Sequence, residues 1–498
     1  MKLTSHILII IQALNFLILT INPYAISPHK ESINRELDPT NYFEPGQQIN
    51  ITRRSLAVKD KIFLWDDGII PYEIRDIFNG TERKLIKQAM RHWEQSTCIN
   101  FVERNKRDDD SYLLFTKLGC GCCSVIGRQG IRKNPISIDD GCAEFGTVLH
   151  ELGHAIGFYH EQNRPDRDDY VEINQDAIQK GFEFKFETVD AIDGNSMNQP
   201  YDYLSIMHYP PFALTNEPNT KTIVPKRKID GQIPEIGQRI GISSGDITAT
   251  NLLYNCPICG GTLFEAKGIF STPLKLNNSK KDFEYCQWTI RAAQGEKIKL
   301  AITLLNINKT PNCLTDYLEI RNGYQTDSTV VGRYCGDVGP VTTIASNFVF
   351  VTLLRSPFQN HRPGFILEYQ TVCGGDIHLE SNDTYYLESP NYPESYDPNK
   401  QCHWLIKAPY KHYIVIKFNY FELEESTGCK NDFLDVRAAG NENAPIIGSY
   451  CGRKDRLEIA TMMNSIVLTF VSNGSKEAGG FSAAISVKPI NNDNWSLE

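Results

Sequence analysis

The spacing of cysteines in the second half of the chain limits its fold more than any other feature. Three cysteines, Cys286, Cys313 and Cys335, recur after a constant interval of 116 residues as Cys402, Cys429 and Cys451. Other residue types keep this interval in the pairs Trp288/Trp404, Asp316/Asp432, Tyr334/Tyr450, Gly364/Gly480 and Phe365/Phe481. One interval kept by so many residue types indicates a duplicated domain.

Apolar and polar residues alternate within each copy. In segments 298–304, 317–321 and 414–418, apolar side chains occupy about every second position, and Gly, Pro and Asn clusters separate such segments. This period of two predicts half-buried strands in an antiparallel sandwich. The spacing suggests four disulfides within the copies, although sequence alone does not fix cysteine pairing: Cys259–Cys286, Cys313–Cys335, Cys373–Cys402 and Cys429–Cys451.

Composition and the N-terminus indicate secretion. A chain of 498 residues should hold about three domains, and its 14 cysteines suit a disulfide framework in an oxidising compartment. An apolar run at 7–21 behind Lys2, followed by small residues at Ala25 and Ser27, predicts a signal peptide over 1–25, with a signal anchor as the alternative. A net charge of -9 without a basic stripe argues against nucleic-acid binding. We therefore expect a secreted, extracellular protein with no membrane span after signal cleavage.

Two further features fit an exported precursor. Residues 26–54 are polar and end in Arg53-Arg54, which predicts a propeptide removed after Arg54, with an exposed charged loop as the alternative. Seven Asn-x-Ser/Thr acceptors fit glycosylation of a secreted chain: Asn50, Asn79, Asn277, Asn308, Asn382, Asn473 and Asn494.

A histidine motif dominates the first half of the chain, where residues 150–161 read HELGHAIGFYHE. His150 and His154 are four residues apart, so a helix places both imidazoles on one face. Gly157 permits the chain to leave that helix and to bring His160 round as a third ligand. Three neutral imidazoles can hold Zn²⁺ and leave one position open for water, as a catalytic zinc requires. A core helix that carries histidines but no metal is the alternative.

The extended motif, with its glycine and third histidine, is the metzincin signature. Downstream, residues 203–209 read YLSIMHY, and Met207 fits the methionine turn that metzincins place after the zinc helix. Glu161 directly after the third histidine and Tyr209 two residues after the methionine make the chain resemble the astacin family in particular. The resemblance implies that Tyr209 is an additional zinc ligand that stabilises the oxyanion, and that Glu161 meets the mature N-terminus. Glu151, next to the first histidine, is the expected general base.

A narrower resemblance is to the tolloid, or procollagen C-proteinase, group of astacins. It is carried by CGCCSVIGR at 120–128, AMRHWE at 89–94, RPDRD at 164–168 and IGQR at 236–239. It implies the bridges Cys98–Cys256, Cys120–Cys142 and a vicinal Cys122–Cys123. Adjacent Cα atoms lie about 3.8 Å apart, below the usual disulfide range of about 4.4–6.8 Å. Two free or differently paired thiols are therefore the alternative to the vicinal bond.

The tolloid resemblance also bears on specificity and latency. It implies that Arg239 favours an acidic residue just after the scissile bond, because a guanidinium pairs well with a carboxylate; an ordinary surface arginine is the alternative. Glu144 departs from the lysine usual in tolloids and puts a strict Asp preference in doubt. Residues 43–47 lack the aspartate with which astacin propeptides block zinc. Asp38 or Glu44 would then have to keep the precursor inactive, or the inhibition by the propeptide would be weak.

The duplicated domain resembles the CUB domain, through its Cys-Gly openings, Cys-x-Trp and Tyr-Cys-Gly motifs and SPNYP at 389–393. The resemblance implies jelly-roll modules that contact proteins, many through calcium. In the second copy, Glu424 and Asp432 match two expected calcium ligands, but Asn473 stands where a later aspartate is expected. The first copy keeps Asp316 and has Asn308 in place of the glutamate, so the resemblance favours calcium in the second copy over the first. The alternative is that Asp316 and Asp432 only cap strands.

Together these features predict an α+β metzincin, astacin-like catalytic domain followed by two all-β CUB jelly-roll sandwiches. The expected order is signal peptide 1–25, propeptide 26–54, protease domain 55–257, CUB domains 259–370 and 373–488, and a C-terminal tail 489–498. The predicted function is a secreted zinc endopeptidase that processes matrix precursors or growth-factor antagonists, with substrates chosen by CUB contacts. The alternatives are a broad-specificity digestive or tissue-penetrating astacin, and a CUB-mediated adhesion protein with a latent protease domain.

Overall fold

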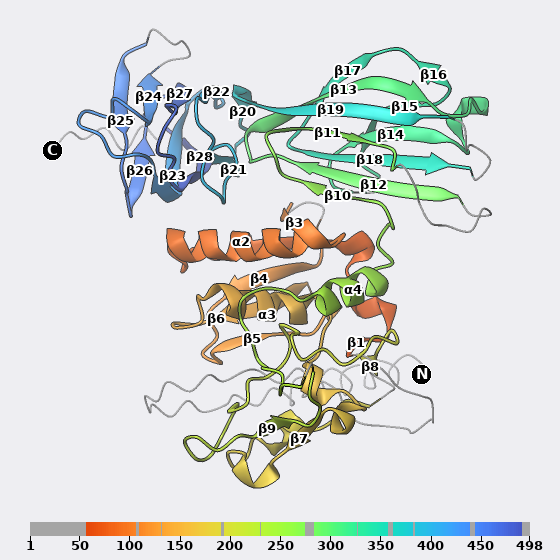
Figure 1. Ribbon diagram of the computed structural model, residues 1–498. Helices are drawn as coiled ribbons and strands as arrows, with labels where there is room; N and C mark the ends of the chain where they lie inside the picture. Colours follow the sequence, from red (N-terminus) through yellow and green to blue (C-terminus); the bar gives the residue numbers. More distant parts are fainter. Residues whose placement is uncertain are drawn as a thin grey trace, which may run out of the picture. The chain divides into compact units, whose positions relative to one another are not determined.

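The structure, a computed structural model, describes most of the chain after residue 55. The described residues are 56–105, 109–130, 132–190, 194–229, 231–273, 283–325, 327–356, 362–381, 384–438 and 444–490. They form an N-terminal domain of helices and strands and two domains built of strands (Figure 1), which confirms the predicted fold class. The signal peptide, the propeptide with Arg54, and Asn50, Asn277, Asn382 and Asn494 lie outside the described residues. Among the described helices, none is long and apolar enough to cross a membrane.

A five-stranded sheet frames the N-terminal domain, in the order β3-β2-β4-β6-β5. Its strands are β2 (Ile69–Ile74), β3 (Asn100–Glu103), β4 (Tyr112–Thr116), β5 (Cys122–Ser124) and β6 (Lys133–Ile138). All neighbours are parallel except β5, which is antiparallel to β6. Two short antiparallel pairs complete the domain: β1 (Ala57–Val58) with β8 (Gly194–Asn195), and β7 (Val171–Ile173) with β9 (Ile223–Pro225).

Three helices pack with this sheet: α2 (Gly80–Ser96), α3 (Phe145–Ile156) and α4 (Ser244–Leu253). A capping box begins α2, in which Asn79 accepts from the Glu82 N–H and the Glu82 side chain accepts from the Asn79 N–H. Trp93 of α2 is fully buried and donates its indole N–H to the Leu149 carbonyl of α3 over 3.2 Å. One apolar core joins the sheet, α2 and α3 and fixes where α3 lies.

Short 3₁₀ turns connect these elements. They are η2 (Lys61–Phe63), η3 (Asp66–Gly68), η4 (Glu161–Asn163), η5 (Arg167–Asp169), η6 (Gln175–Ala177), η7 (Glu183–Phe186) and, in the next domain, η8 (Pro311–Cys313). A second, smaller apolar cluster lies between α3 and α4 in sequence and includes Tyr201, Tyr203 and Tyr209. The methionine turn joins the two clusters, because Ile206 and Met207 belong to the first and Tyr209 belongs to the second.

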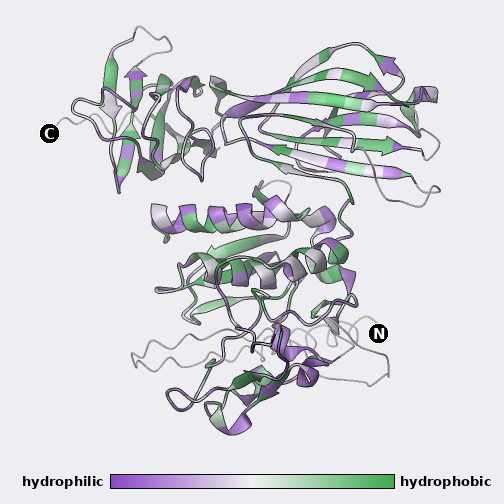
Figure 2. Ribbon diagram, in the orientation of Figure 1, coloured by the Kyte–Doolittle hydropathy of each residue, from purple (hydrophilic) through white to green (hydrophobic). Residues whose placement is uncertain are grey.

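The first strand-built domain is a sandwich of two sheets. One sheet has the order β10-β12-β18-β14-β15 and the other β11-β19-β13-β16, with β17 also paired to β13. The strands are β10 (Gly260–Leu263), β11 (Lys267–Ser271), β12 (Glu284–Arg291), β13 (Glu296–Asn306), β14 (Tyr317–Asn322), β15 (Thr329–Tyr334), β16 (Asp337–Val338), β17 (Val341–Ala345), β18 (Phe348–Arg355) and β19 (Gly364–Cys373). Alternating hydrophobic and hydrophilic residues along these strands are visible in Figure 2.

The second strand-built domain repeats this plan, with sheets β20-β22-β27-β24-β25 and β21-β28-β23-β26. Its strands are β20 (Gly375–His378), β21 (Thr384–Glu388), β22 (Gln401–Lys407), β23 (His412–Glu422), β24 (Phe433–Ala438), β25 (Ile446–Tyr450), β26 (Leu457–Ala460), β27 (Ser465–Val471) and β28 (Gly480–Pro489). The two domains also share the positions of their β-bulges. Bulges at Ile302/Leu304 and Ile320/Arg321 recur at the same interval of 116 residues as Phe418/Tyr420 and Val436/Arg437.

Seven disulfides use all 14 cysteines. Five join the expected partners: Cys98–Cys256, Cys259–Cys286, Cys313–Cys335, Cys373–Cys402 and Cys429–Cys451. The other two correct the sequence prediction, because Cys120 pairs with Cys123 and Cys122 pairs with Cys142. The predicted bonds Cys120–Cys142 and Cys122–Cys123 are therefore wrong.

The local strand geometry explains the corrected pairing. Cys122 and Cys123 are consecutive on β5, and successive side chains of a strand point to opposite faces. Each thiol therefore reaches a different partner. The Cα separations, 6.4 Å for Cys120–Cys123 and 5.5 Å for Cys122–Cys142, fall within the usual range of about 4.4–6.8 Å.

Candidate metal centre

Helix α3 supplies two of the three predicted metal ligands. The helix is buried along nearly its whole length, and Val148, Leu149 and Leu152 are in the core. His150 and His154, one turn apart, are buried as well. The helix ends at Gly157, whose φ of 128° is a conformation that side-chain-bearing residues rarely adopt, and the Gly157 N–H bonds to carbonyls of the last turn.

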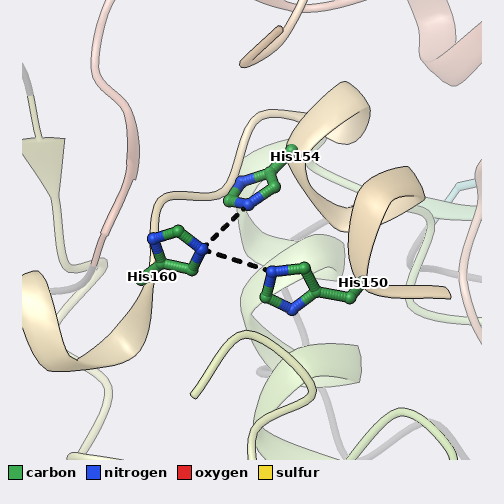
Figure 3. A group of neighbouring side chains, drawn as sticks. All are labelled: His150, His154 and His160. Carbon is green, nitrogen blue, oxygen red and sulfur yellow. Dashed lines mark hydrogen bonds between the residues drawn. The ribbon is translucent and has the colours of Figure 1, made fainter. Parts of the chain in front are cut away.

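The chain then turns back and brings His160 to the helix (Figure 3). The Nε2 atom of His160 lies 3.2 Å from Nε2 of His150 and 3.1 Å from Nε2 of His154. The three side chains come from the helix and the loop that follows it, and their ligand atoms all lie within 4.8 Å of one another. The structure thus brings together the three histidines that the sequence singled out.

Backbone carbonyls fix which nitrogen of two rings faces the centre. His150 Nδ1 contacts the Ile206 carbonyl over 2.8 Å, and His154 Nδ1 contacts the Phe158 carbonyl over 2.7 Å. A carbonyl only accepts, so each Nδ1 carries the proton and each Nε2 presents a lone pair to the centre. Converging lone pairs repel unless a cation lies between them. This carbonyl support of the second ring nitrogen is what metal-binding histidines usually have.

The spacing of the nitrogens is compatible with zinc. Zn–N bonds of about 2.0–2.1 Å at tetrahedral angles place ligand nitrogens about 3.3 Å apart. The observed separations of 3.1 and 3.2 Å are close to that value. Three imidazoles are also the ligand set of a catalytic zinc with an open position. The residues present therefore fit zinc.

Met207 lies beneath the histidine helix. Its side chain is 2% exposed, and a Cβ added at Gly153 would lie 2.4 Å from the Met207 sulfur. Gly153 is therefore the position on α3 that lets the methionine turn pack against the helix between the two histidines. The Met207 carbonyl also accepts from the Glu161 N–H over 3.2 Å, which ties the methionine turn to the loop of the third histidine.

The other predicted residues lie close to these ligands. Glu151 is buried on α3 beside His150. The ring of Tyr209 lies 4.3 Å, centroid to centroid, from the ring of His160, and its backbone N–H donates to Gln162 over 3.0 Å. Three imidazoles thus form the centre, with the Tyr209 ring packed against one of them and Glu151 buried on the same helix as the other two.

Comparison with known proteins agrees with this geometry. The model of the astacin peptidase family matches residues 57–255, and the CUB domain model matches residues 259–369 and 373–485. The N-terminal domain belongs to the astacin family. Its two strand-built domains are CUB domains.

Curated relatives of this astacin include tolloid-type proteins. It is 41% identical over 422 residues to a bone morphogenetic protein 1 homolog of Strongylocentrotus purpuratus, covering 84% of this chain and 65% of the relative. It is 40% identical over 419 residues to bone morphogenetic protein 1 of Xenopus laevis, covering 84% of this chain and 58% of the relative. The chain thus spans less than two thirds of the length of these relatives.

Among solved structures, high choriolytic enzyme 1, a hatching enzyme zinc-protease from Oryzias latipes, is 37% identical. The match covers 41% of this chain and 100% of that one, with a TM-score of 0.37.

Within the described part of the chain, Glu161 is bonded to an arginine side chain and to a backbone N–H. Its carboxylate accepts from Arg164 Nη1 over 2.9 Å and from the Asp202 N–H over 2.8 Å. Burial raises the pKa of Glu161 to about 7, against the opposing effect of Arg164. The mature N-terminus that the resemblance implied as its partner falls at Ser55, outside the described residues.

Sequence reasoning missed several residues that hold the centre. Asp246, at the start of α4, accepts from Ser205 Oγ over 2.7 Å and from the Ile206 N–H over 2.9 Å. Burial raises the pKa of Asp246 to about 6, and these hydrogen bonds oppose that rise. The Ser-x-x-Asp pattern at 243–246, a capping box in the structure, could have marked the start of α4 but not its contact with the methionine turn.

Sequence reasoning also missed His208, which directly follows Met207 in the methionine turn. Its ring contacts the Tyr201 hydroxyl over 2.7 Å and the Tyr209 carbonyl over 2.8 Å. Burial lowers the pKa of His208 to about 4, so this imidazole is neutral at pH 7 and acts as a fixed hydrogen-bonding group.

The contact between Gly153 and Met207 leads to a testable prediction. In Gly153→Ala the new methyl group would collide with the Met207 sulfur. Alanine favours a helix by about 1 kcal/mol over glycine, whereas overpacking a core costs about 1–3 kcal/mol. We expect a net loss of thermal stability and weaker zinc retention against a chelator.

Gly339→Ala serves as the control, because a Cβ there meets nothing within 4 Å. A Gly153→Ala protein that unfolds at the wild-type temperature and holds zinc as firmly as wild type would contradict the proposed packing.

Proposed function

We propose that this protein is a secreted zinc endopeptidase that hydrolyses peptide bonds in extracellular proteins. The observation that carries the proposal is the convergence of three Nε2 atoms, from His150, His154 and His160. Glu151, which directly follows His150 on α3, is buried. A zinc ion held by these nitrogens would polarise the scissile carbonyl and lower the pKa of water to about 7. Membership of the astacin family supports the same activity.

Glu151 is the proposed proton carrier. It directly follows the first histidine on α3 and is buried, and we propose that its carboxylate reaches the attacking water without being a metal ligand. It would take a proton from the attacking water as the C–O bond forms, and return that proton to the amine as the C–N bond breaks. One proton thus moves from water to the leaving group, and Glu151 ends the cycle ionised as it began.

Tyr209 is the proposed donor to the developing oxyanion. Its ring lies against His160, and its backbone is held by Gln162 Oε1, so the phenol is anchored next to the third ligand. A phenolic O–H directed at the carbonyl oxygen would stabilise charge that exists only in the transition state.

The role of Glu151 leads to a prediction for Glu151→Gln. The amide keeps the size of the side chain but cannot accept a proton, so peptide cleavage should fall by a factor of at least about 100. Zinc content, measured by atomic absorption, should stay near one per chain. Glu187→Gln, at an exposed glutamate of the same domain, is the matched control and should cleave normally. Substantial cleavage by Glu151→Gln would refute the assignment.

A tolloid-like role, with a preference for an acidic residue after the scissile bond, is the finer part of the proposal. Arg239 lies at the methionine turn, where its Nη1 donates to the Ile206 carbonyl over 3.1 Å and to the His208 carbonyl over 3.2 Å. This location puts a permanent positive charge beside Met207, under the proposed zinc. The similarity to bone morphogenetic protein 1 supports the same interpretation.

Cleavage-site profiling of the secreted enzyme on a peptide library tests this preference. We expect Asp and Glu to dominate the position just after the cut, because Arg239 supplies a cation there. An even distribution of residues at that position would favour the alternative, a broad-specificity digestive or tissue-penetrating astacin.

Maturation after Arg54 is supported by the residues that follow it. Leu56 and Ala57 are buried, and the Leu56 carbonyl accepts from the Tyr159 N–H over 2.7 Å. The Val58 N–H donates to the Gly157 carbonyl over 2.9 Å. The start of the proposed mature chain is thus bonded to the loop between the second and third histidines. A secreted protein that stays uncleaved at Arg54 and inert would instead favour the CUB-mediated adhesion alternative.

The second CUB domain brings the expected calcium ligands together but bonds them internally. Asp432 accepts from the Tyr396 hydroxyl over 2.5 Å and from the Asn473 N–H over 2.7 Å. Glu424 accepts from the Asn473 side-chain amide over 2.8 Å. The Asn473 amide nitrogen therefore lies against the Glu424 carboxylate oxygen that a cation would have to contact. We propose that calcium binding at this site is weak.

Asn473→Asp tests this interpretation. A carboxylate in place of the amide adds a charged ligand and removes the donor, so calcium should bind at least about tenfold more tightly than in wild type. Isothermal titration of the whole chain with calcium measures the difference. Ser475→Ala, which removes the glycan acceptor but keeps the amide, should behave like wild type. A wild-type affinity equal to that of Asn473→Asp would contradict the proposal.

A further inference from the structure

One backbone carbonyl of the methionine turn serves two side chains from distant parts of the sequence. The Ile206 carbonyl accepts from His150 Nδ1 over 2.8 Å and from Arg239 Nη1 over 3.1 Å. A carbonyl oxygen has two lone pairs, so both bonds can form at once. His150 is a proposed zinc ligand, and Arg239 is therefore one hydrogen-bonded group away from the metal centre.

Arg239 is itself held in place on several sides. Its Nη1 also donates to the His208 carbonyl over 3.2 Å and to the Gln238 carbonyl over 2.9 Å. The carbonyls of residues 206 and 208 flank Met207, so a single guanidinium nitrogen holds both sides of the methionine. The backbone of Arg239 packs directly against Gly146 in the first turn of α3. A Cβ added at Gly146 would lie only 1.9 Å from the Arg239 carbonyl oxygen, so this contact requires glycine.

The backbone N–H of Ile206 is bonded as well as its carbonyl. Its N–H donates to Asp246 Oδ2 over 2.9 Å, so a carboxylate faces the N–H and a guanidinium faces the carbonyl. The two groups contact the peptide units on either side of the Ile206 Cα, and together they restrain the backbone of this residue. His154 differs, because its Nδ1 bonds to the Phe158 carbonyl within its own loop.

We propose that Arg239 is a positioning residue for the zinc centre, acting through the Ile206 carbonyl on His150. Fixing that carbonyl fixes the tautomer and the ring orientation of His150, and with them the direction of its Nε2 lone pair. Loss of such an outer partner typically weakens metal binding by about 10–100-fold. The inference rests on the proposed zinc site but not on any preference for acidic substrates.

Zinc affinity, measured by competition with a chromophoric chelator, tests the proposal directly. For Arg239→Ala we expect the dissociation constant for Zn²⁺ to rise at least about tenfold. Arg239→Lys should recover part of that affinity, because an ammonium also donates to carbonyls. The visible spectrum of the Co²⁺-substituted protein should shift in Arg239→Ala, since it reports the arrangement of ligands rather than overall stability.

Two peptides that differ only in having Asp or Ala after the scissile bond separate this role from substrate recognition. We expect kcat/KM of Arg239→Ala to fall for both peptides. Unchanged zinc affinity and an unchanged Co²⁺ spectrum, with a loss confined to the Asp peptide, would overturn the proposal and leave Arg239 as a recognition residue only. Because the zinc measurement needs no peptidase activity, it stands even if the proposed function fails.

Two further variants keep the outcome interpretable. Arg227→Ala removes an exposed arginine of the same domain that donates to the Asp169 carbonyl and should leave zinc affinity unchanged. Asp246→Asn disturbs the opposite end of the Ile206 residue and should weaken zinc binding in the same direction as Arg239→Ala. If Arg239→Ala fails to fold, Arg239→Lys and Asp246→Asn carry the test, and wild-type zinc affinity in both would refute the proposal.

Discussion

Three imidazole Nε2 atoms that meet at one point are the constraint on which the rest of the catalytic domain depends. The lone pairs of His150 and His154 repel each other without a cation, and neutral rings would turn away unless their other nitrogens were held. The chain holds two of them with backbone carbonyls, those of Ile206 and Phe158. Each carbonyl must in turn be placed, one by the methionine turn and the other by the glycine-terminated end of α3. The burial of α3 among core residues makes that placement rigid.

What the sequence could predict is what depends on local spacing. The histidine motif needs only the helical period and one glycine, and the duplication needs only a constant interval, so the order of residues alone reveals both. Even the bulges at Ile302/Leu304 and Phe418/Tyr420 follow that interval, although no residue type marks them. In these cases one short segment, or one repeat, holds all of the information.

What the sequence could not predict depends on which distant segments meet. The pairing of Cys120 and Cys122 follows from the direction in which β5 presents its side chains, and the motif alone contains no such direction. Asp246 and Arg239 meet the methionine turn from segments about 30 to 40 residues away in sequence. The sequence analysis interpreted Arg239 as a surface or substrate-binding cation and did not single out Asp246, and only the fold reveals that both residues contact the backbone of Ile206.

If Arg239 has the proposed role in substrate recognition, the Ile206 carbonyl that it shares with His150 gives a physical reason why specificity and metal binding would be coupled. A guanidinium that holds the methionine turn cannot move far without moving the carbonyl that orients His150. A substrate carboxylate drawn to the same charge would therefore act on a group that already supports a zinc ligand. Replacing Arg239 to change substrate preference would then also change the metal centre, because one nitrogen contacts both flanks of Met207.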